Sequence, residues 1–224
     1  APLNKAALHR GGWAFHDEHQ MFAKLTSHTG FFGEMNVIPE FATFRVTSHV
    51  ALREAVNLIT PERIENALRL ADTTLRAMGY TPPRIGVAAL NPHCGENGLF
   101  GDEEIRIIRP TLEKLEREGI SATGPLSSDT IFLRAKRGEF DGVVMMYHDQ
   151  GHIVVKTLGF VMDPESGQMS ALSGVNVTLG LPIVRTSVDH GTAFDIAGKG
   201  VANAQSMVEA IEVAARLVGA RRTR

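Results

Sequence analysis

The sequence predicts a wound α/β fold, in which helices alternate with the strands of one sheet. One observation predicts the fold class, and a second predicts that the chain is not divided into domains. Amphipathic segments with helical spacing alternate with short apolar runs that are bounded by turn residues. In addition, no repeat, low-complexity tract or Gly/Ser-rich linker divides the 224 residues. We therefore expect residues 1–224 to form a single unit without an internal domain boundary.

Three segments predict helices. Thr60 is an expected N-cap with a proline at the next position, and apolar residues then recur at spacings of three and four until Gly79. The segment Asp102–Gly119 repeats this design, with an expected kink at Pro110. A third helix is expected from Asn203 to Val218 and would close the domain.

Short apolar runs between these helices predict buried strands at Ile85–Leu90, Gly142–Tyr147 and Leu181–Val184. A further apolar stretch runs from Phe41 to Val46. Wound sheets bind their ligands beyond the carboxyl ends of the strands. The residues that directly follow these runs are therefore the first candidates for chemistry.

Three histidines, His49, His93 and His148, follow three of the apolar runs. If folding brings them together, three neutral imidazoles with open coordination positions would form a catalytic divalent-metal site, suited to zinc, cobalt or nickel. The alternative is that these histidines lie at helix N-termini and bond to backbone. Hydrogen-bond partners on the second ring nitrogen of each imidazole would distinguish the two.

Charged residues near the same loops are further candidates. Asp149 adjoins His148, and Asp129 is either an active-site acid or the N-cap of a helix. Lys156, Asn176 and Arg185 could hold a carboxylate or a phosphate, the alternative being surface salt bridges.

Composition excludes several classes of function. Lys and Arg number 23 against 25 Asp and Glu, a net charge of −2, so neither nucleic acid nor an anionic membrane is an expected partner. No apolar run reaches the roughly 18 residues that span a bilayer, and the first residues do not form a signal peptide pattern. The one cysteine is typical of a reducing compartment, so we expect the cytoplasm.

No G-x-G-x-x-G or Walker sequence opens a helix, which argues against a Rossmann nucleotide site. The loop Asp189–Gly200 nevertheless mixes small residues with His, Asp and Lys before the last helix, so its backbone could approach a cofactor closely.

The chain as a whole resembles the 4-hydroxythreonine-4-phosphate dehydrogenases of pyridoxal phosphate synthesis and their relatives that act on 4-phosphorylated sugar acids. The resemblance rests on TSHVALR (47–53), LNPH (90–93), GPLSSDT (124–130), YHDQG (147–151), GVNVTLGLP (174–182) and RTSVDHGTA (185–193). It implies the fold of isocitrate and isopropylmalate dehydrogenases, NAD binding through the loop that starts at His190, and a homodimer whose sites borrow groups from both subunits.

Carried over position by position, the resemblance implies four sets of site residues. The metal ligands are His49, His93 and His148. The substrate contacts are Lys156, Asn176 and Arg185, with Glu18 and His19 at the place of a further substrate-binding stretch. The acidic residues of the active site are Asp129 and Asp149, and Lys156 is a further catalytic candidate. The cofactor loop contributes His190, Gly191, Thr192, Ala193 and Asp195.

Three departures from the family pattern stand out. The family's Gly-His-Thr-Glu stretch is replaced by Asp17 to Gln20, so that the acid Glu18 takes the place of a substrate-binding imidazole. Residues Val161–Ser173 lengthen the loop after Lys156. A Gly-Asp-Pro motif that precedes this region in the family is absent, so we expect an N-terminally incomplete chain that holds the substrate and metal part and the C-terminal portion of the cofactor-binding part.

The expected reaction is the NAD-linked oxidation of a secondary alcohol in a 4-phosphorylated hydroxy acid, assisted by a divalent metal (Zn, Co, Ni or Mg) and followed by loss of CO2. One alternative is a cis-dihydrodiol dehydrogenase of aromatic dicarboxylate breakdown, whose relatives share the stretch His148–Ile153. From other classes, a three-histidine metal hydrolase would need no nicotinamide, and a noncatalytic anion-binding module would need neither metal nor cofactor.

Overall fold

The computed structural model describes residues 3–15, 17–162, 164 and 169–222. In this part of the chain the main sheet has seven strands in the order β4-β3-β5-β2-β1-β8-β9. Their bounds are β1 (Gly33–Val37), β2 (Ala42–Arg45), β3 (Ile85–Ala88), β4 (Ala122–Leu126), β5 (Gly142–Met145), β8 (Val175–Leu179) and β9 (Arg185–Val188). The predicted α/β fold is confirmed.

The sheet is mixed. Strands β4, β3, β5 and β2 are parallel neighbours, whereas β1, β8 and β9 are joined by antiparallel pairing. The carboxyl ends of β3, β5 and β2 therefore meet at one edge of the sheet. This edge is where the three histidines were expected.

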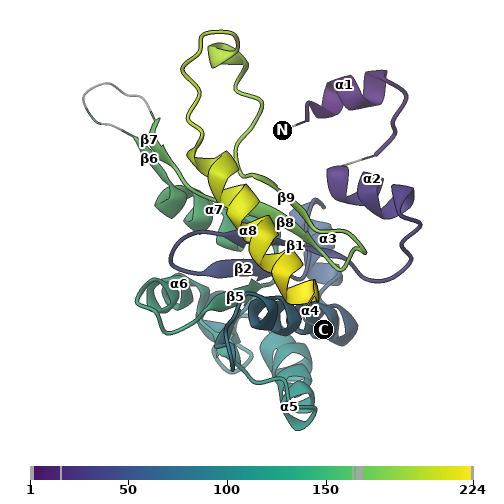
Figure 1. Ribbon diagram of the computed structural model, residues 1–224. Helices are drawn as coiled ribbons and strands as arrows, with labels where there is room; N and C mark the ends of the chain where they lie inside the picture. The colour runs from purple at the N-terminus through teal and green to yellow at the C-terminus, as the bar shows by residue number, and fades with distance from the viewer. Residues whose placement is uncertain (1–2, 16, 163, 165–168, 223–224) are drawn as a thin grey trace.

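Helices cover both faces of the sheet (Figure 1). Alternate residues of β5 show this directly, because Val144 packs in one apolar cluster and Val143 and Met145 pack in the other. The first cluster includes residues of α4 (Pro61–Ala77), α5 (Arg109–Arg117) and α8 (Gln205–Arg222), and the second includes residues of α6 (Ser128–Lys136) and α7 (His148–Gly159). The result is a three-layer arrangement with the core on either side of the sheet.

The predicted helices are present, and their ends have local causes. The side chain of Thr60 accepts a hydrogen bond from the backbone N–H of Arg63, the N-cap that α4 was expected to have and that stabilises a helix by about 1 kcal/mol. The helix expected over 102–119 is interrupted, as its proline suggested. A π-helical turn (Glu104–Ile108) precedes α5, and Pro110 lies at the start of α5, where its missing N–H leaves no gap in the helix.

The strand predicted at Leu181–Val184 is wrong. These residues form the connection between β8 and β9, which pair as an antiparallel hairpin. Only one residue of this apolar connection belongs to the core: Leu181 is buried, while the neighbouring Pro182 and Ile183 are exposed. Proline has no N–H to donate to a strand ladder, which favours a turn here.

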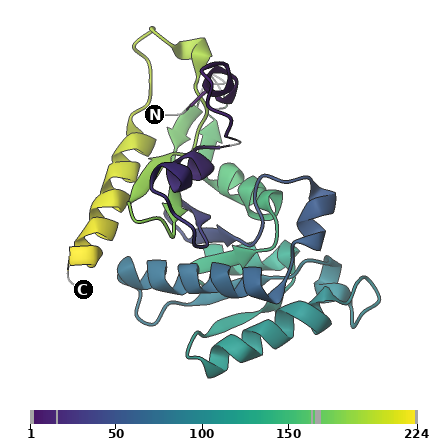
Figure 2. The same ribbon diagram turned by 90° about the vertical axis from the view of Figure 1, so that its right-hand side faces the viewer.

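The remaining elements are α1 (Lys5–Arg10), α2 (Glu18–Leu25), α3 (Leu52–Asn57), the 3-10 helices η1 (Pro92–Gly95) and η3 (Phe194–Ile196), and the strands β6 (Phe160–Met162) and β7 (Met169–Leu172). The lengthened loop Val161–Ser173 contains most of the β6–β7 hairpin, although residues 163 and 165–168 lie outside the described residues. Figure 1 shows α1 and α2 to one side of the sheet, and in the turned view of Figure 2 they lie towards the viewer. Within the described ranges, no helix is both long and apolar enough to cross a bilayer.

Candidate active site at the edge of the sheet

A cavity of about 280 Å³ opens where β2 and β5 end and where β8 and β9 pass. Most of the side chains that line it can carry charge or titrate. They are the acids Asp17, Glu18, Glu34 and Asp189, the bases Lys5, Arg45, Lys156 and Arg185, and the imidazoles of His19, His49, His148, His152 and His190. Such a concentration of titratable groups in one cavity is typical of an active site.

His49 and His148 lie together in this cavity, with ring centroids 5.2 Å apart. Nδ1 of His49 is 3.1 Å from Oδ2 of Asp17, and Nδ1 of His148 is 2.6 Å from Oδ1 of Asp149. An ionised carboxylate can only accept, so each Nδ1 carries a proton, and in the neutral form of each ring the lone pair is then on Nε2. A carboxylate on the second nitrogen is the arrangement that metal-binding histidines adopt. Within the described part of the chain, neither ring bonds to backbone as the alternative required.

His93 follows β3, next to β5, but does not join the other two histidines. It is exposed within η1, and no hydrogen bond, ion pair or ring contact of its imidazole occurs among the residues that the structure describes. In the same residues, no three His, Cys, Asp or Glu side chains are grouped so that they could hold a metal ion. Metal ligation by the three histidines therefore stays a prediction, with two of the three positioned for it.

His152 was not singled out by sequence reasoning. Helix α7 presents His148, His152 and Lys156 at intervals of four residues, and the rings of His148 and His152 stack with centroids 4.2 Å apart. Burial, followed by the charge of Arg45, lowers the pKa of His152 to about 3, so its ring is neutral at physiological pH. Burial also lowers the pKa of His148, against the opposing effect of Asp149. The spacing of four residues between His148 and His152 was the sequence feature that could have predicted that both lie on one face of a helix.

The three predicted anion-binding residues do meet in the cavity. Nζ of Lys156 is 3.0 Å from Oδ2 of Asp189, and Nη1 of Arg185 donates to Oδ1 of Asn176 at 2.6 Å. The Arg185 side chain is only 13% exposed, which does not fit a surface salt bridge. Burial lowers the pKa of Arg185, while the nearby acids Glu18, Glu34 and Asp17 oppose this shift.

A buried ion pair between Glu34 and Arg45 forms the floor of the cavity, and sequence reasoning missed it. Arg45 Nη1 lies 3.3 Å from Glu34 Oε2, and Ser48 donates to the same carboxylate at 2.6 Å. Burial alone would raise the pKa of Glu34, but the hydrogen bond from His19 and the charge of Arg45 outweigh it and hold this pKa well below its usual range. Both residues lie in strands, and a charged residue among apolar neighbours was the sequence feature that could have indicated the buried ion pair.

Glu18 and His19 begin α2 and have different surroundings. His19 is buried, with Nδ1 2.5 Å from the hydroxyl of Thr178 and Nε2 in an ion pair with Glu34, so both ring nitrogens are engaged. Glu18 faces the cavity instead. It forms a long ion pair with Arg185, with Nη2 3.9 Å from Oε1 of Glu18.

The two predicted acids Asp129 and Asp149 lie outside the cavity lining. Asp129 is exposed in the first turn of α6, whose N-cap position is Ser127, so the N-cap interpretation of Asp129 is wrong. Asp149 is 72% exposed and reaches the cavity only through its hydrogen bond to His148.

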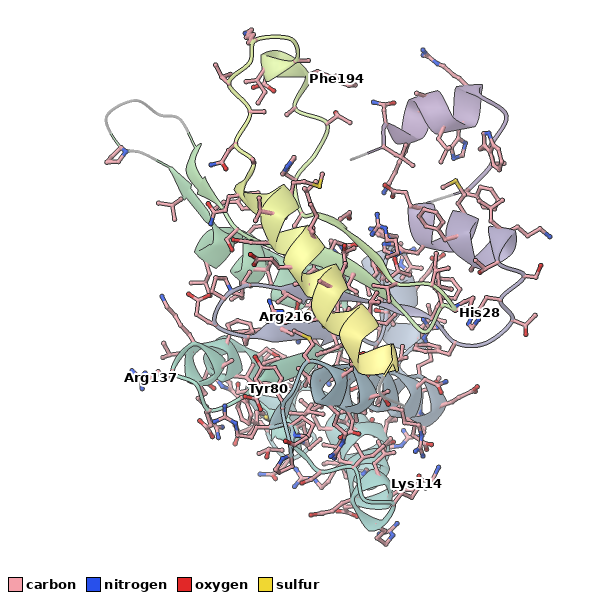
Figure 3. The ribbon with its side chains drawn as sticks, viewed as in Figure 1. His28, Tyr80, Lys114, Arg137, Phe194 and Arg216 are labelled. Carbon is pink, nitrogen blue, oxygen red and sulfur yellow. The ribbon has the colours of Figure 1, made fainter. Side chains whose placement is uncertain are left out.

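The predicted cofactor loop starts at the cavity and then leaves it. His190 and Gly191 line the cavity, whereas Thr192, Ala193 and Asp195 belong to a loop that extends away from the sheet, with Phe194 near its tip (Figure 3). A Cβ at Gly191 would meet nothing within 4 Å, so the loop alone forms no close-fitting cradle. Cofactor binding by this loop stays a prediction.

Comparison with known proteins places these features in a family context. Residues 1–214 match the family model described as "Pyridoxal phosphate biosynthetic protein PdxA". The chain is 48% identical over 219 residues to the D-threonate 4-phosphate dehydrogenase of Cupriavidus necator, covering 97% of this chain and 62% of that protein. The crystal structure of 4-hydroxythreonine-4-phosphate dehydrogenase from Klebsiella pneumoniae matches with a TM-score of 0.78 and 44% identity, covering 97% and 63% of the two chains.

More distant structures match as well. A terephthalate 1,2-cis-dihydrodiol dehydrogenase from Burkholderia xenovorans has a TM-score of 0.63 at 29% identity, covering 84% of this chain and 56% of that one. The isocitrate dehydrogenase of Methylococcus capsulatus, at 15% identity and a TM-score of 0.58 over 98% of this chain and 77% of that one, shares the fold alone. The chain thus spans about three fifths of the length of the curated relatives that it matches.

Proposed function

The chain belongs to the PdxA family of pyridoxal phosphate biosynthetic proteins, and on this premise we propose that it carries the substrate site of a divalent-metal-dependent, NAD-linked dehydrogenase. The substrate class is a 4-phosphorylated hydroxy acid, such as 4-hydroxythreonine 4-phosphate or threonate 4-phosphate. Its secondary alcohol is oxidised, and the resulting β-keto acid loses CO2. The phosphorylated substrate is supported by the similarity to dehydrogenases that are named for phosphorylated substrates.

The observation that carries this proposal is the carboxylate-backed pair His49 and His148 in a cavity that also holds Lys156, Asn176 and Arg185. The donor set suits a divalent metal, because both imidazoles keep a free Nε2. When bound, NAD supplies a hydride acceptor and a divalent cation supplies a Lewis acid.

The chain's own residues would bind and orient the substrate. Arg185 and Asn176, joined to each other, present a fixed pair of polar groups to an anionic part of the substrate. Lys156 Nζ, held by the carboxylate and the carbonyl of Asp189, would exchange a proton with the substrate hydroxyl. His152 and Asp149 position the His148 ring, one by stacking on it and one by accepting from its Nδ1.

We further propose that His93 and Asp129 serve the site of a second copy of the chain. Both residues are exposed, neither lines the cavity of its own chain, and the elements that carry them, η1 and α6, pack against each other. A homodimer with shared sites accounts for this placement. His93 does not reach His49 and His148 within one chain, so in this proposal the third histidine of each metal site comes from the other chain.

Calorimetric titration with NAD and with zinc tests the proposal and separates it from the other classes. We expect both to bind. Zinc binding should be lost in His49→Gln and retained in His9→Gln, which changes an exposed histidine that does not line the cavity. Zinc binding without NAD binding would favour a metal hydrolase, and binding of neither would favour an anion-binding module.

A dihydrodiol dehydrogenase is the second candidate, favoured by the likeness to the Burkholderia xenovorans structure. NADH formation with an unphosphorylated cis-dihydrodiol and with a 4-phosphorylated hydroxy acid, measured side by side, distinguishes the two. We expect turnover of the phosphorylated acid.

A further inference from the structure

Glu18 differs from the other acids of the cavity in what its carboxylate contacts. Asp17 accepts from His49 and from the backbone of Gln20, and Glu34 and Asp189 are each held by a cation. The Glu18 carboxylate makes no hydrogen bond to any residue that the structure describes. Its one ion pair, to Arg185, spans 3.9 Å, which is beyond hydrogen-bond distance.

This carboxylate is also largely shielded from water, with 17% of its side chain exposed in the cavity wall. A shielded carboxylate with unused acceptors is costly unless a donor fills them. In the structure neither neighbouring donor reaches this carboxylate, because His19 uses both ring nitrogens on Thr178 and Glu34, and Nη2 of Arg185 stays 3.9 Å away while Nη1 donates to Asn176. The Glu18 carboxylate is therefore open to a donor that enters the cavity.

The charge of the cavity narrows the chemistry of that donor. Its lining Asp and Glu side chains equal its lining Lys and Arg side chains in number, four of each, so apart from the proposed metal the cavity has no surplus positive charge for a substrate with two anionic groups. A second anion near Glu18 would be repelled, whereas a cation would be attracted and would also donate hydrogen bonds. A hydroxyl could donate a hydrogen bond but would add no positive charge beside Glu18.

Resting on the proposed function, we infer that Glu18 is a specificity-determining residue that binds a cationic amino group of the substrate. The site then prefers a phosphorylated amino acid with a neighbouring hydroxyl over the corresponding phosphorylated dihydroxy acid. The two substrates named above form a matched pair for this choice, because they differ only in an ammonium or a hydroxyl group at carbon 2.

The test is the dissociation constant of each ligand, measured by calorimetry on the zinc-loaded protein without NAD, so that no turnover is required. We expect wild type to bind 4-hydroxythreonine 4-phosphate about tenfold or more tightly than threonate 4-phosphate, the size of a charge-assisted hydrogen bond. Glu18→Gln should bring the two constants close together, chiefly by weakening the amino ligand. Glu18→His, which restores the residue type of the family pattern, should favour the dihydroxy acid.

Glu40→Gln is the matched control, since it removes the same charge from an exposed residue between β1 and β2 and should keep the wild-type ratio. An unchanged ratio in both Glu18 variants, or a wild type that binds the two ligands equally, would overturn the inference while the proposed function stands. If wild type bound neither ligand, the proposed function would fail and this inference with it. Should one variant fold poorly, the wild-type ratio and the other variant still decide.

Discussion

Asp17 Oδ2 lies 3.1 Å from Nδ1 of His49, and this contact joins α2 to the end of β2. Asp17 is 6% exposed, yet the pKa of its carboxyl is lowered. Burial would raise it, but the hydrogen bond with His49 and that from the backbone of Gln20 outweigh burial. Asp17 therefore remains ionised and keeps the proton of His49 on Nδ1, which leaves Nε2 available to a metal.

Asp17→Asn should weaken zinc binding by about 10- to 100-fold, because a neutral amide holds the imidazole less firmly and makes it a weaker donor. Helix α2 should survive, since asparagine is as good an N-cap as aspartate. Zinc titration by calorimetry measures the effect. Asp102→Asn, at an exposed i,i+4 ion pair, is the control, and equal zinc affinity in both variants would contradict the role given to Asp17.

Mixing experiments test whether His93 acts in a second copy. His93→Ala and His49→Ala should each be inactive alone, because each variant dimer lacks one ligand at every site. Mixed and re-equilibrated, the two variants should form heterodimers with one intact site and recover up to about half of the wild-type activity per heterodimer. Activity is followed as NADH formation. No recovery despite proven subunit exchange would show that His93 and His49 act from one chain, or not at all.

The Glu34–Arg45 pair should be essential to the fold. Arg45→Met would leave the buried charge of Glu34 without its guanidinium partner, with only His19 and Ser48 beside it, at a cost of about 3–5 kcal/mol in the free energy of unfolding. The double variant Arg45→Met with Glu34→Gln should recover part of this loss, because no charge is then left uncompensated. Urea denaturation measures both. Arg69→Met, which breaks the exposed pair with Glu118, should change stability little, and a similar small change for Arg45→Met would contradict the account.

The sequence predicted the scaffold better than the contacts within the site. Helical spacing located α4 and α8 because their buried faces are regular, and the strand-end rule brought His49 and His148 to one edge. The sequence did not predict the roles of Glu34 and Arg45. Charged residues inside strands indicate a buried ion-pair network only when their partners are known. These partners, such as His19, come from distant parts of the chain, and no local pattern encodes that meeting.

Acid should destabilise the metal-free protein partly through His152. Its pKa falls from an ordinary value of 6.5 to about 3 on folding, so between these values the unfolded chain binds the proton and the folded one does not. Stability is then fully present above pH 6.5 and is lost as the pH falls towards 3. His152→Gln should flatten this dependence of the urea midpoint, measured with a chelator present, whereas His9→Gln should not. An equally steep decline in His152→Gln would contradict the assignment.

Whether oxidation depends on a metal held by His49 and His148 is best tested by the rate of NADH formation from a 4-phosphorylated hydroxy acid. Wild type and His148→Gln are each stripped with a chelator and then titrated with zinc, cobalt or nickel. We predict no activity in stripped wild type, recovery with added metal, and no recovery in the variant at any metal concentration. Wild-type rates in His148→Gln, or activity in stripped wild type that added metal does not change, would contradict the claim that this histidine pair holds the metal on which oxidation depends.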